Sequence, residues 1–441
     1  MPKLKVITFG CQANELDSAR IAGVLARRGY TLTEEDADAD LIVLNGCSIR
    51  EKAEQKLLSR LGTLQALKRA HPWLRLGVAG CLAQREGEAL LRRFPFLDLV
   101  VGNGEHLAEI PQLLSIQAGR QASAVCEPAG LFPEDIAVHR DSQIRAWVGV
   151  MEGCDNFCAF CVVPFTRGRE RSRHPDDILR EVIALRDAGY REITLLGQTV
   201  NSYGKKLQPP VSFGALLRRI DAVLDRQVRV RFTTSHPKDV TPELAEAMAS
   251  LPSVCEHMHL PVQAGSDQTL ERMGRGYSRE EYLQAVAMLR AAVPELAITT
   301  DIIVGFPGER EADFEETLTL MDAVGFDGCF AFKFSPREGT PAATLPDQVP
   351  AEAKATRLAR VFELQNQLSL SRNQGLLGRH AEILVDRALR TREAGLVAGR
   401  TRQNKIVHCQ ASAGVPEGGL VNVEITRATP HHLKGILIPS P

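Results

Sequence analysis

Strand-like apolar runs alternate with helical segments along two long stretches of this chain, and this alternation limits the possible folds more than any other feature. In residues 1–115, helical segments separate four predicted strands: Lys5–Phe9, Leu41–Leu44, Arg75–Ala79 and Leu97–Val101. Strands that alternate with helices form parallel sheets covered by helices. We therefore predict an α/β chain that opens with a doubly wound parallel sheet, as a domain over residues 1–117.

The second stretch, residues 145–340, continues the alternation at greater length. Its six predicted strands are Trp147–Met151, Glu192–Leu196, Val228–Thr233, Glu256–Leu260, Ile298–Val304 and Gly328–Phe334. Eight such units close a full barrel, so six predict a partial (βα)6 barrel. We place this central domain at residues 140–370. Residues 116–143 lack the pattern and predict a linker.

The last part of the chain has a different texture. Residues 351–376 predict one exposed helix. Short β runs separated by Gly and charged turns follow it: Ala381–Val385, Gly395–Ala398, Lys405–Cys409 and Leu420–Ile425. Such runs predict a small antiparallel β-barrel, which forms a third domain over residues 376–438.

Composition limits the function classes. A length of 441 residues fits about three domains. The net charge of −1 leaves no global positive field, so a nucleic-acid partner would need a local basic patch. From residue 376 onward the chain has nine Lys and Arg against five Asp and Glu. No run resembles a signal peptide or reaches the roughly 18 apolar residues of a membrane span, so we expect a cytoplasmic protein without membrane contact.

Three of the ten cysteines lie within eight residues, directly after a predicted strand. They are Cys154, Cys158 and Cys161. Thiolates are ligands for zinc and for iron–sulfur clusters. A zinc site closes with four ligands, and no fourth Cys or His lies nearby in the sequence, although a distant residue could complete a zinc knuckle. Three thiolates suit a four-iron cluster with one open iron, which Phe157 and Phe160 would shield.

This C-x-x-x-C-x-x-C loop after the first barrel strand resembles that of the radical S-adenosylmethionine superfamily. The resemblance implies that the three cysteines bind a [4Fe-4S] cluster, which reductively cleaves S-adenosylmethionine to a 5′-deoxyadenosyl radical. Polar and Gly-rich segments also end the later strands, at the barrel mouth where cofactors bind. Ordinary turn chemistry would explain any one of them. The candidate cofactor contacts are Phe160, Gln198, Ser235, Gln263 and Asp301.

Three further cysteines follow strands of the N-terminal sheet, each directly after a Gly. They are Cys11, Cys47 and Cys81, separated by 36 and 34 residues, about one βα unit each. The carboxyl ends of parallel strands share one edge of the sheet, so the three thiols should converge. They are either three buried structural cysteines or the ligands of a second open cluster, and their equivalent positions favour the cluster.

The paired arrangement is similar to the methylthiotransferase family over nearly the whole chain. The matching segments are Thr8–Ser18, Cys47–Lys56, Gly77–Glu86, Cys161–Arg173, Thr234–Lys238, His259–Asp267, Asp301–Glu309 and Ser335–Ala342. Ala13 and Gly46 depart from the family pattern of Met and Thr. The resemblance implies two [4Fe-4S] clusters: the loop cluster makes the radical, and the second cluster presents a sulfur that another S-adenosylmethionine methylates.

Within this family the chain is most similar to the branch that acts on prenylated tRNA. The expected reaction converts N6-(dimethylallyl)adenosine at position 37 of the anticodon loop to its 2-methylthio form, without a catalytic acid–base residue. The terminal barrel resembles a TRAM domain, a small RNA-binding module. Its expected phosphate contacts are Arg400, Arg402, Lys405, Arg427 and Lys434; a solvated charged face is the alternative.

Several alternatives stay open. The same chemistry could act on threonylcarbamoyl-adenosine tRNA or on a ribosomal-protein aspartate, and a non-catalytic protein could bind zinc at both cysteine sets. The arginine run Arg167, Arg169, Arg171 and Arg173 could contact tRNA phosphate or a cofactor carboxylate, or form salt bridges. We expect an electron donor such as flavodoxin or ferredoxin, and a monomer.

Overall fold

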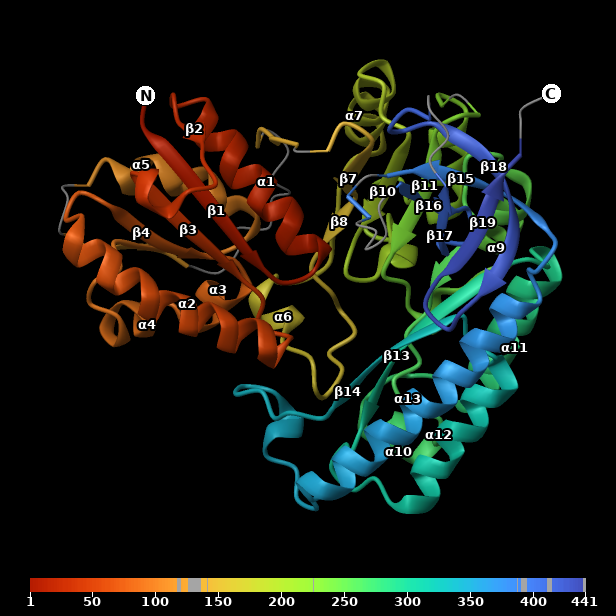
Figure 1. The fold of residues 1–441 in the computed structure, drawn as a ribbon. Coiled ribbons are helices and arrows are strands. Elements are labelled where there is room, and N and C mark those ends of the chain that lie inside the picture. Colours follow the sequence, from red (N-terminus) through yellow and green to blue (C-terminus); the bar gives the residue numbers. More distant parts are fainter. Residues whose placement is uncertain are drawn as a thin grey trace.

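The structure is a computed structural model that describes residues 1–116, 120–125, 136–140, 142–224, 226–386, 388–389, 395–410 and 415–438. Three bodies follow one another along the chain, as Figure 1 shows: an N-terminal α/β body, a central α/β body and a C-terminal barrel. The N-terminal body lies on one side of the central body, and the barrel lies near strand β11. No described helix has the length and apolar character needed to span a membrane.

The N-terminal sheet has six parallel strands in the order β2-β1-β3-β4-β5-β6. The strands are β1 (Lys3–Phe9), β2 (Thr31–Leu32), β3 (Leu41–Gly46), β4 (Arg75–Ala79), β5 (Leu99–Val101) and β6 (Ala122–Ala124). The α-helices are α1 (Gln12–Ala26), α2 (Glu51–Ala70), α3 (Cys81–Glu86), α4 (Glu88–Arg93) and α5 (Ile110–Leu114). The sheet confirms the predicted doubly wound architecture.

Strand β3 shows why this sheet needs helices on both of its faces. Every residue of β3 is buried. Leu41 and Val43 belong to the apolar cluster that contains Ile21 of α1, whereas Leu44 belongs to the cluster that contains Leu57 of α2. Successive side chains of a strand point to opposite faces, so a continuous apolar run is stable only between two helical layers.

Two N-terminal elements differ from the sequence-based expectation. Residues 116–143 were expected to form only a linker, but β6 lies within them and pairs with β5, with Val101 opposite Ala124. The sheet therefore continues beyond residue 117. A strand of three residues is too short to show a recognisable period. The helix expected over Glu86–Arg93 is two helices, because α3 begins at Cys81 and Gly87 separates it from α4.

Six strands of the central body pair with one another in parallel. They are β7 (Arg145–Gly149), β10 (Glu192–Leu196), β11 (Arg229–Thr233), β12 (His257–His259), β13 (Ala297–Val304) and β14 (Gly328–Lys333). They form two ladders, β7-β10-β11 and β12-β13-β14, joined by the bridge between Val230 and Val254. The helices are α6 (Val163–Thr166), α7 (Pro175–Asp187), α8 (Phe213–Asp221), α9 (Pro242–Ser250), α10 (Asp267–Arg272), α11 (Arg279–Ala292) and α12 (Glu311–Val324). This is the expected partial barrel.

Shorter elements complete the first two bodies. The hairpin of β8 (Met151–Glu152) and β9 (Arg171–Ser172) brackets the central cysteine loop. The 3₁₀ turns among the described residues are η1 (Asp36–Asp38), η2 (Gly104–Glu109), η3 (Val200–Ser202), η4 (Pro237–Asp239) and η5 (Pro341–Ala343).

The long helix α13 (Ala351–Gln374) leads into a closed five-stranded barrel in the order β15-β16-β17-β19-β18. Its strands are β15 (His380–Val385), β16 (Leu396–Thr401), β17 (Ile406–Gln410), β18 (Leu420–Ala428) and β19 (Leu433–Leu437). The barrel was expected to be antiparallel, but β17 and β19 pair in parallel. Strand β19 was also not expected. Closure needs it, because without β19 both β17 and β18 would have an open edge.

Candidate metal and cofactor centre

The central cysteine loop begins at β8, and its backbone is tightly constrained. Gly153 precedes Cys154 with φ of +77°. A Cβ atom there would lie 2.1 Å from the carbonyl oxygen of Arg169. Only Gly combines this conformation with so close an approach to the neighbouring backbone. The hairpin therefore fixes the point where the cysteine loop begins.

Polar groups surround the loop thiols. Arg275 Nη1 lies 3.4 Å from Cys158 Sγ, and the same guanidinium donates to the carbonyl oxygen of Pro261 at 2.8 Å. The Thr199 hydroxyl lies 3.4 Å from Cys154 Sγ. Burial raises the pKa of Cys161 to about 12, and the neighbouring cysteines add to the effect. A bound metal cation would offset the effects of burial and of the neighbouring cysteines on the thiol pKa, so the loop suits a metal centre.

The structure brings together Cys11, Cys47 and Cys81 at the carboxyl ends of β1, β3 and β4, which are neighbours in the sheet. The Cys47 thiol hydrogen-bonds to Cys11 and lowers the pKa of Cys11, aided by the positive charge of Arg167. The same contact raises the pKa of Cys47. Burial raises the pKa of Cys81. Three thiols from distant segments therefore share one electrostatic environment.

A buried amide pair holds two of these strand ends in position. Asn14 Nδ2 donates to Asn45 Oδ1 at 3.1 Å, and Asn45 Nδ2 donates to the Asn14 carbonyl oxygen at 2.8 Å. Gly80, which precedes Cys81, has φ of +90°, and a Cβ there would lie 2.2 Å from Asn45 Oδ1. The Asn103 amide lies 3.5 Å from Cys81 Sγ and donates to the Thr166 carbonyl oxygen at 3.0 Å. These contacts link the site to the central body.

A buried ion network joins the N-terminal cysteine site to the central body. Arg167, just after α6, contacts Asp17 of α1 with Nη2 and Oδ2 at 2.6 Å. Arg20 of α1 contacts Glu152 of β8 at 2.7 Å. Asp17 and Arg20 also lie 3.4 Å apart. Buried charges need such close pairing, so this network fixes how the two bodies meet.

The arginine run beyond the central loop forms ion pairs at all four positions. Besides the pair of Arg167, Arg169 contacts Asp155 at 2.6 Å and Arg171 contacts Glu152 at 3.6 Å. Arg173 pairs with Glu181. These contacts favour the salt-bridge alternative over phosphate contacts for this run.

The chemistry of the thiols limits which metal each cysteine set fits. Among the described residues, no group of three or more His, Cys, Asp or Glu side chains is arranged to hold a single metal ion. Thiolates are soft ligands that iron–sulfur clusters take as readily as zinc does, so the chemistry of both cysteine sets fits a cluster.

The strand ends of the central body carry polar atoms without a partner. Gln198 Oε1 and Ser235 Oγ are buried and make no hydrogen bond within the described residues, and His236 Nε2 is in the same state. Burial lowers the pKa of His236 to about 2, so its ring is neutral. Buried polar atoms are normally hydrogen-bonded, so these atoms without a partner indicate a ligand-binding site. Gln198 and Ser235 were expected at such a site, whereas His236 was not.

The other expected cofactor contacts lie on the adjoining strands. Gln263 is buried with φ of +76°, and its N–H donates to the Asp301 carbonyl oxygen at 2.9 Å. Asp301 is half-buried, and its carboxylate lies 3.4 Å from His259 Nε2. Phe160 of the cysteine loop is half-buried, with its ring 6.5 Å from that of Phe306. All three remain candidate contacts.

Sequence reasoning missed Arg275, Thr199 and Asn103, each of which contacts a thiol of one of the two cysteine sets. Their positions carry no spacing signal relative to the cysteines. Only the folded chain brings them within reach.

The expected RNA contacts of the barrel lie in different environments. Arg402 pairs with Glu256 at 2.8 Å, and Lys405 pairs with Asp327 at 2.8 Å. Arg400 donates to Asn404 Oδ1 at 3.2 Å, while Arg427 is exposed and Lys434 half-buried. In the opposite direction, from the central body to the barrel, Arg229 and Arg231 of β11 donate hydrogen bonds to backbone carbonyls of the barrel. Arg402 and Lys405 therefore attach the barrel to the central body, and an RNA role for the set stays a prediction.

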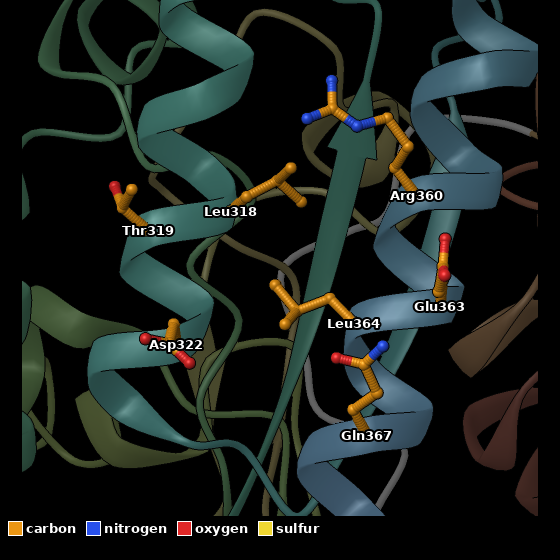
Figure 2. A pocket seen from close by; sticks show the side chains of 7 residues that line it. All are labelled: Leu318, Thr319, Asp322, Arg360, Glu363, Leu364 and Gln367. Atoms are coloured by element: carbon orange, nitrogen blue, oxygen red, sulfur yellow. The ribbon is translucent and has the colours of Figure 1, made fainter.

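A groove of about 380 Å³ lies elsewhere, between α12 and α13. Figure 2 shows Leu318 and Leu364 facing each other across it, with Arg360 and Glu363 on α13. Arg360 is already paired with Glu311 and Glu315. The groove contains no cysteine, and α12 and α13 lie on the outer face of the barrel strands. Its lining residues include none of the candidate cofactor contacts.

Comparisons with known proteins identify two families. The radical SAM superfamily model matches residues 148–321, and a family described as uncharacterized protein family UPF0004 matches residues 3–102. The radical SAM family implies a [4Fe-4S] cluster and S-adenosylmethionine. Each match contains one complete cysteine set.

Solved structures share the fold. The radical S-adenosylmethionine methyltransferase TsrM from Kitasatospora setae aligns with a TM-score of 0.55 at 13% identity, over 78% of this chain and 77% of that one. The cobalamin-dependent S-adenosylmethionine radical enzyme OxsB aligns with a TM-score of 0.54 at 14% identity, over 83% of this chain and 56% of that one.

Curated relatives match the chain at much higher identity. The tRNA-2-methylthio-N(6)-dimethylallyladenosine synthase of Carboxydothermus hydrogenoformans is 48% identical over 437 residues, which cover 98% of each chain. The protein of the same name from Moorella thermoacetica is 47% identical over 438 residues, again 98% of each chain. With the radical SAM match and both cysteine sets in place, the chain belongs to the tRNA-2-methylthio-N(6)-dimethylallyladenosine synthase family.

Proposed function

We propose that this chain is a radical SAM methylthiotransferase that converts N6-(dimethylallyl)adenosine to its 2-methylthio form at position 37 of the tRNA anticodon loop. The names of the full-length relatives support this substrate over threonylcarbamoyl-adenosine tRNA and over a ribosomal-protein aspartate. The same relatives argue against a non-catalytic zinc protein.

One observation carries the proposal: two three-cysteine sets from different bodies are joined by buried contacts. Asn103 links Cys81 to Thr166 in the segment that follows the central loop, and Arg167 reaches from that segment to Asp17. Two sites joined in this way fit a reaction in which one centre activates the base and the other delivers sulfur.

We infer that each cysteine set holds one [4Fe-4S] cluster. Cys154, Cys158 and Cys161 would hold the first, and the three strand-end cysteines the second. When bound, the clusters and S-adenosylmethionine supply the radical that removes hydrogen from adenine C2 and the sulfur that replaces it.

The chain's own residues bind, orient and exclude water. Phe160 of the cysteine loop is half-buried, and Arg275 places positive charge at Cys158. Gln198, Ser235 and Asp301 would orient the polar groups of S-adenosylmethionine at the strand ends. Exclusion of water protects a reactive carbon radical from side reactions.

Several finer points stay predictions. The electron donor would be a low-potential protein such as flavodoxin or ferredoxin. The enzyme would act as a monomer in the cytoplasm, with the barrel helping to bind tRNA.

The test is an anaerobic assay of the reconstituted enzyme with S-adenosylmethionine, a reductant and prenylated tRNA. Mass spectrometry of the nucleosides should show a methylthio group on the prenylated adenosine. The product should vanish in Cys158→Ala and in Cys47→Ala but persist in Cys409→Ala, a buried barrel thiol far from both sites in the sequence. Cleavage of S-adenosylmethionine without this product would refute the substrate. A colourless protein without cleavage would refute the radical chemistry.

A further inference from the structure

Two phenylalanines of strand β14 are exposed although they lie on the sheet of the central body. Phe330 is 57% exposed and Phe332 is 41% exposed. Burial of a Phe side chain stabilises a fold, so exposure of two neighbouring rings has a cost in stability. Such a pair points to a binding surface.

The register of β13 and β14 shows which face the two rings occupy. Phe330 lies opposite Asp301, and Phe332 lies opposite Ile303. Ile302 and Val304 of β13 are fully buried in the core that contains Phe314 of α12, whereas Asp301 and Ile303 are only half-buried. The rings therefore lie on the inner face of the open barrel, away from the helices.

Contacts beyond the end of β14 connect this face to both cysteine sites. The ring of Phe334, directly after the strand, packs edge-to-face against that of Phe306 at 5.2 Å, and the Phe306 ring lies 6.5 Å from that of Phe160 in the cysteine loop. Arg337, three residues further on, donates to the carbonyl oxygen of Ile49 at 2.9 Å. Ile49 lies two residues after Cys47. Figure 1 shows β14 at the edge of the central body that faces the N-terminal body.

The charge on this face disfavours an anionic ligand. The Asp301 carboxylate lies opposite Phe330, and the His259 ring lies 5.9 Å from the Phe330 ring. His259 also contacts Asp301 and Thr299, so its ring nitrogens are engaged within the site. A dimethylallyl group is apolar and suits two phenyl rings, whereas a threonylcarbamoyl group carries a carboxylate that Asp301 would repel.

We propose that Phe330 and Phe332 bind the N6-dimethylallyl group of the target adenosine and so select prenylated tRNA. This inference rests on the proposed function and adds the residues that determine its substrate specificity. The two rings would position the base between the cysteine sites through its apolar substituent. The sequence alone does not separate them from the fourteen other phenylalanines of the chain.

The experiment measures RNA binding rather than turnover. Reconstituted enzyme without reductant is titrated with fluorescent anticodon stem-loop RNA that carries dimethylallyladenosine, unmodified adenosine or threonylcarbamoyladenosine. The wild-type enzyme should bind the prenylated RNA about tenfold or more tightly than the unmodified RNA, since a small apolar group contributes on that scale. Phe330→Ala with Phe332→Ala should abolish most of this preference and leave the affinity for unmodified RNA unchanged.

Two controls separate recognition from folding. Phe362→Ala removes another exposed ring, 44% exposed on α13, and should keep the full preference. Phe330→Leu with Phe332→Leu keeps the surface apolar and should retain part of the preference, even if the alanine variants prove unstable. Iron content reports whether each variant is folded and loaded.

Two outcomes would overturn the inference. One is a full prenyl preference in folded alanine or leucine variants, and the other is a wild-type enzyme without preference. Neither would refute the proposed function, because the nucleoside assay tests methylthiolation independently of this preference.

Discussion

The two cysteine sites differ in how far they depend on the rest of the chain. Cys154, Cys158 and Cys161 lie on one loop, so local backbone geometry almost suffices to bring them together. The strand-end site collects its thiols from three βα units and forms only when β1, β3 and β4 are correctly aligned. A contiguous motif is robust to distant changes, whereas a dispersed site depends on global packing.

The contacts that support the thiols are local at the loop site and come from distant segments at the strand-end site. At the loop, Gly153 and the β8–β9 hairpin define the backbone. At the strand ends, Asn14, Asn45 and Asn103 support the thiols, and the ion network from Arg167 crosses between bodies. The central body thus contributes directly to the N-terminal site.

The largest expected effect is the loss of one cluster at a time. Cys158→Ala and Cys47→Ala should each lose about half of the bound iron, because each removes one of the three thiols that we propose hold one cluster. Iron analysis and electron paramagnetic resonance of the reduced proteins measure this. If either substitution emptied both sites, the two clusters would not be independent. Cys255→Ala, a buried thiol outside both sites, is the control.

Glycine substitutions sharpen the comparison. Gly80→Ala should deplete the strand-end cluster, since its Cβ would meet Asn45 Oδ1 at 2.2 Å at a positive φ. Gly153→Ala should instead deplete the loop cluster, since its Cβ would meet the Arg169 carbonyl oxygen. The resonance signal that each variant loses can be compared with those of the cysteine variants. Loss of the same signal from Gly80→Ala and from Gly153→Ala would contradict the expectation that each glycine supports a different site. Gly276→Ala, at a positive φ with open space around it, controls for backbone strain.

The charge network should matter more for stability than exposed pairs do. Arg167→Gln leaves the buried carboxylate of Asp17 with only the 3.4 Å contact to Arg20. Removal of one partner from a buried pair costs about 3–5 kcal/mol. Arg169→Gln is the matched control, because the Arg169 side chain is 68% exposed and an exposed pair contributes about 0–1 kcal/mol. Urea unfolding measures the free energy of unfolding of both variants. Equal losses of stability in Arg167→Gln and Arg169→Gln would contradict the role of burial.

The smallest expected effect is a pH dependence at the loop. Burial opposes ionisation of Asp155, but hydrogen bonds from Lys206, the Glu170 amide and Arg169 lower its pKa from 3.8 to about 2. A depressed carboxyl pKa stabilises the fold above the unfolded value, and this stability is lost as the pH falls from about 4 to about 2. Wild-type stability should therefore exceed that of Asp155→Asn at pH 5, and the difference should shrink toward pH 2.5. Unfolding of the cluster-free proteins measures this. A stability difference between wild type and Asp155→Asn that does not change with pH would exclude titration of Asp155 as its cause.

The sequence predicted much of the architecture and both cysteine sets. Strands such as Arg75–Ala79 and Glu192–Leu196 were predicted to the residue, because their apolar runs are bounded by clear turn signals. It did not predict β6, β19 or the division between α3 and α4. These elements are short, and they become stable only by pairing or packing with elements formed elsewhere.

Side-chain partners were the least predictable part of the site. Arg402 and Lys405 belong to a basic segment, yet they pair with Glu256 and Asp327 of the central body. Arg275 lies more than a hundred residues from Cys158, yet contacts its thiol. Charge counting along the chain does not reveal such partners, because carboxylates and cations distant in sequence meet only in the folded state.

The sequence by itself determined the alternation of strands and helices, and it placed a cysteine after each of three strands and three more on one loop. Those features depend on local periodicity and spacing, which a linear pattern records directly. Tertiary structure alone decided which groups surround the thiols, how Arg167 joins the two bodies, and that Phe330 and Phe332 remain exposed beside the site. These depend on strand register and on burial, and both arise only when distant segments pack together.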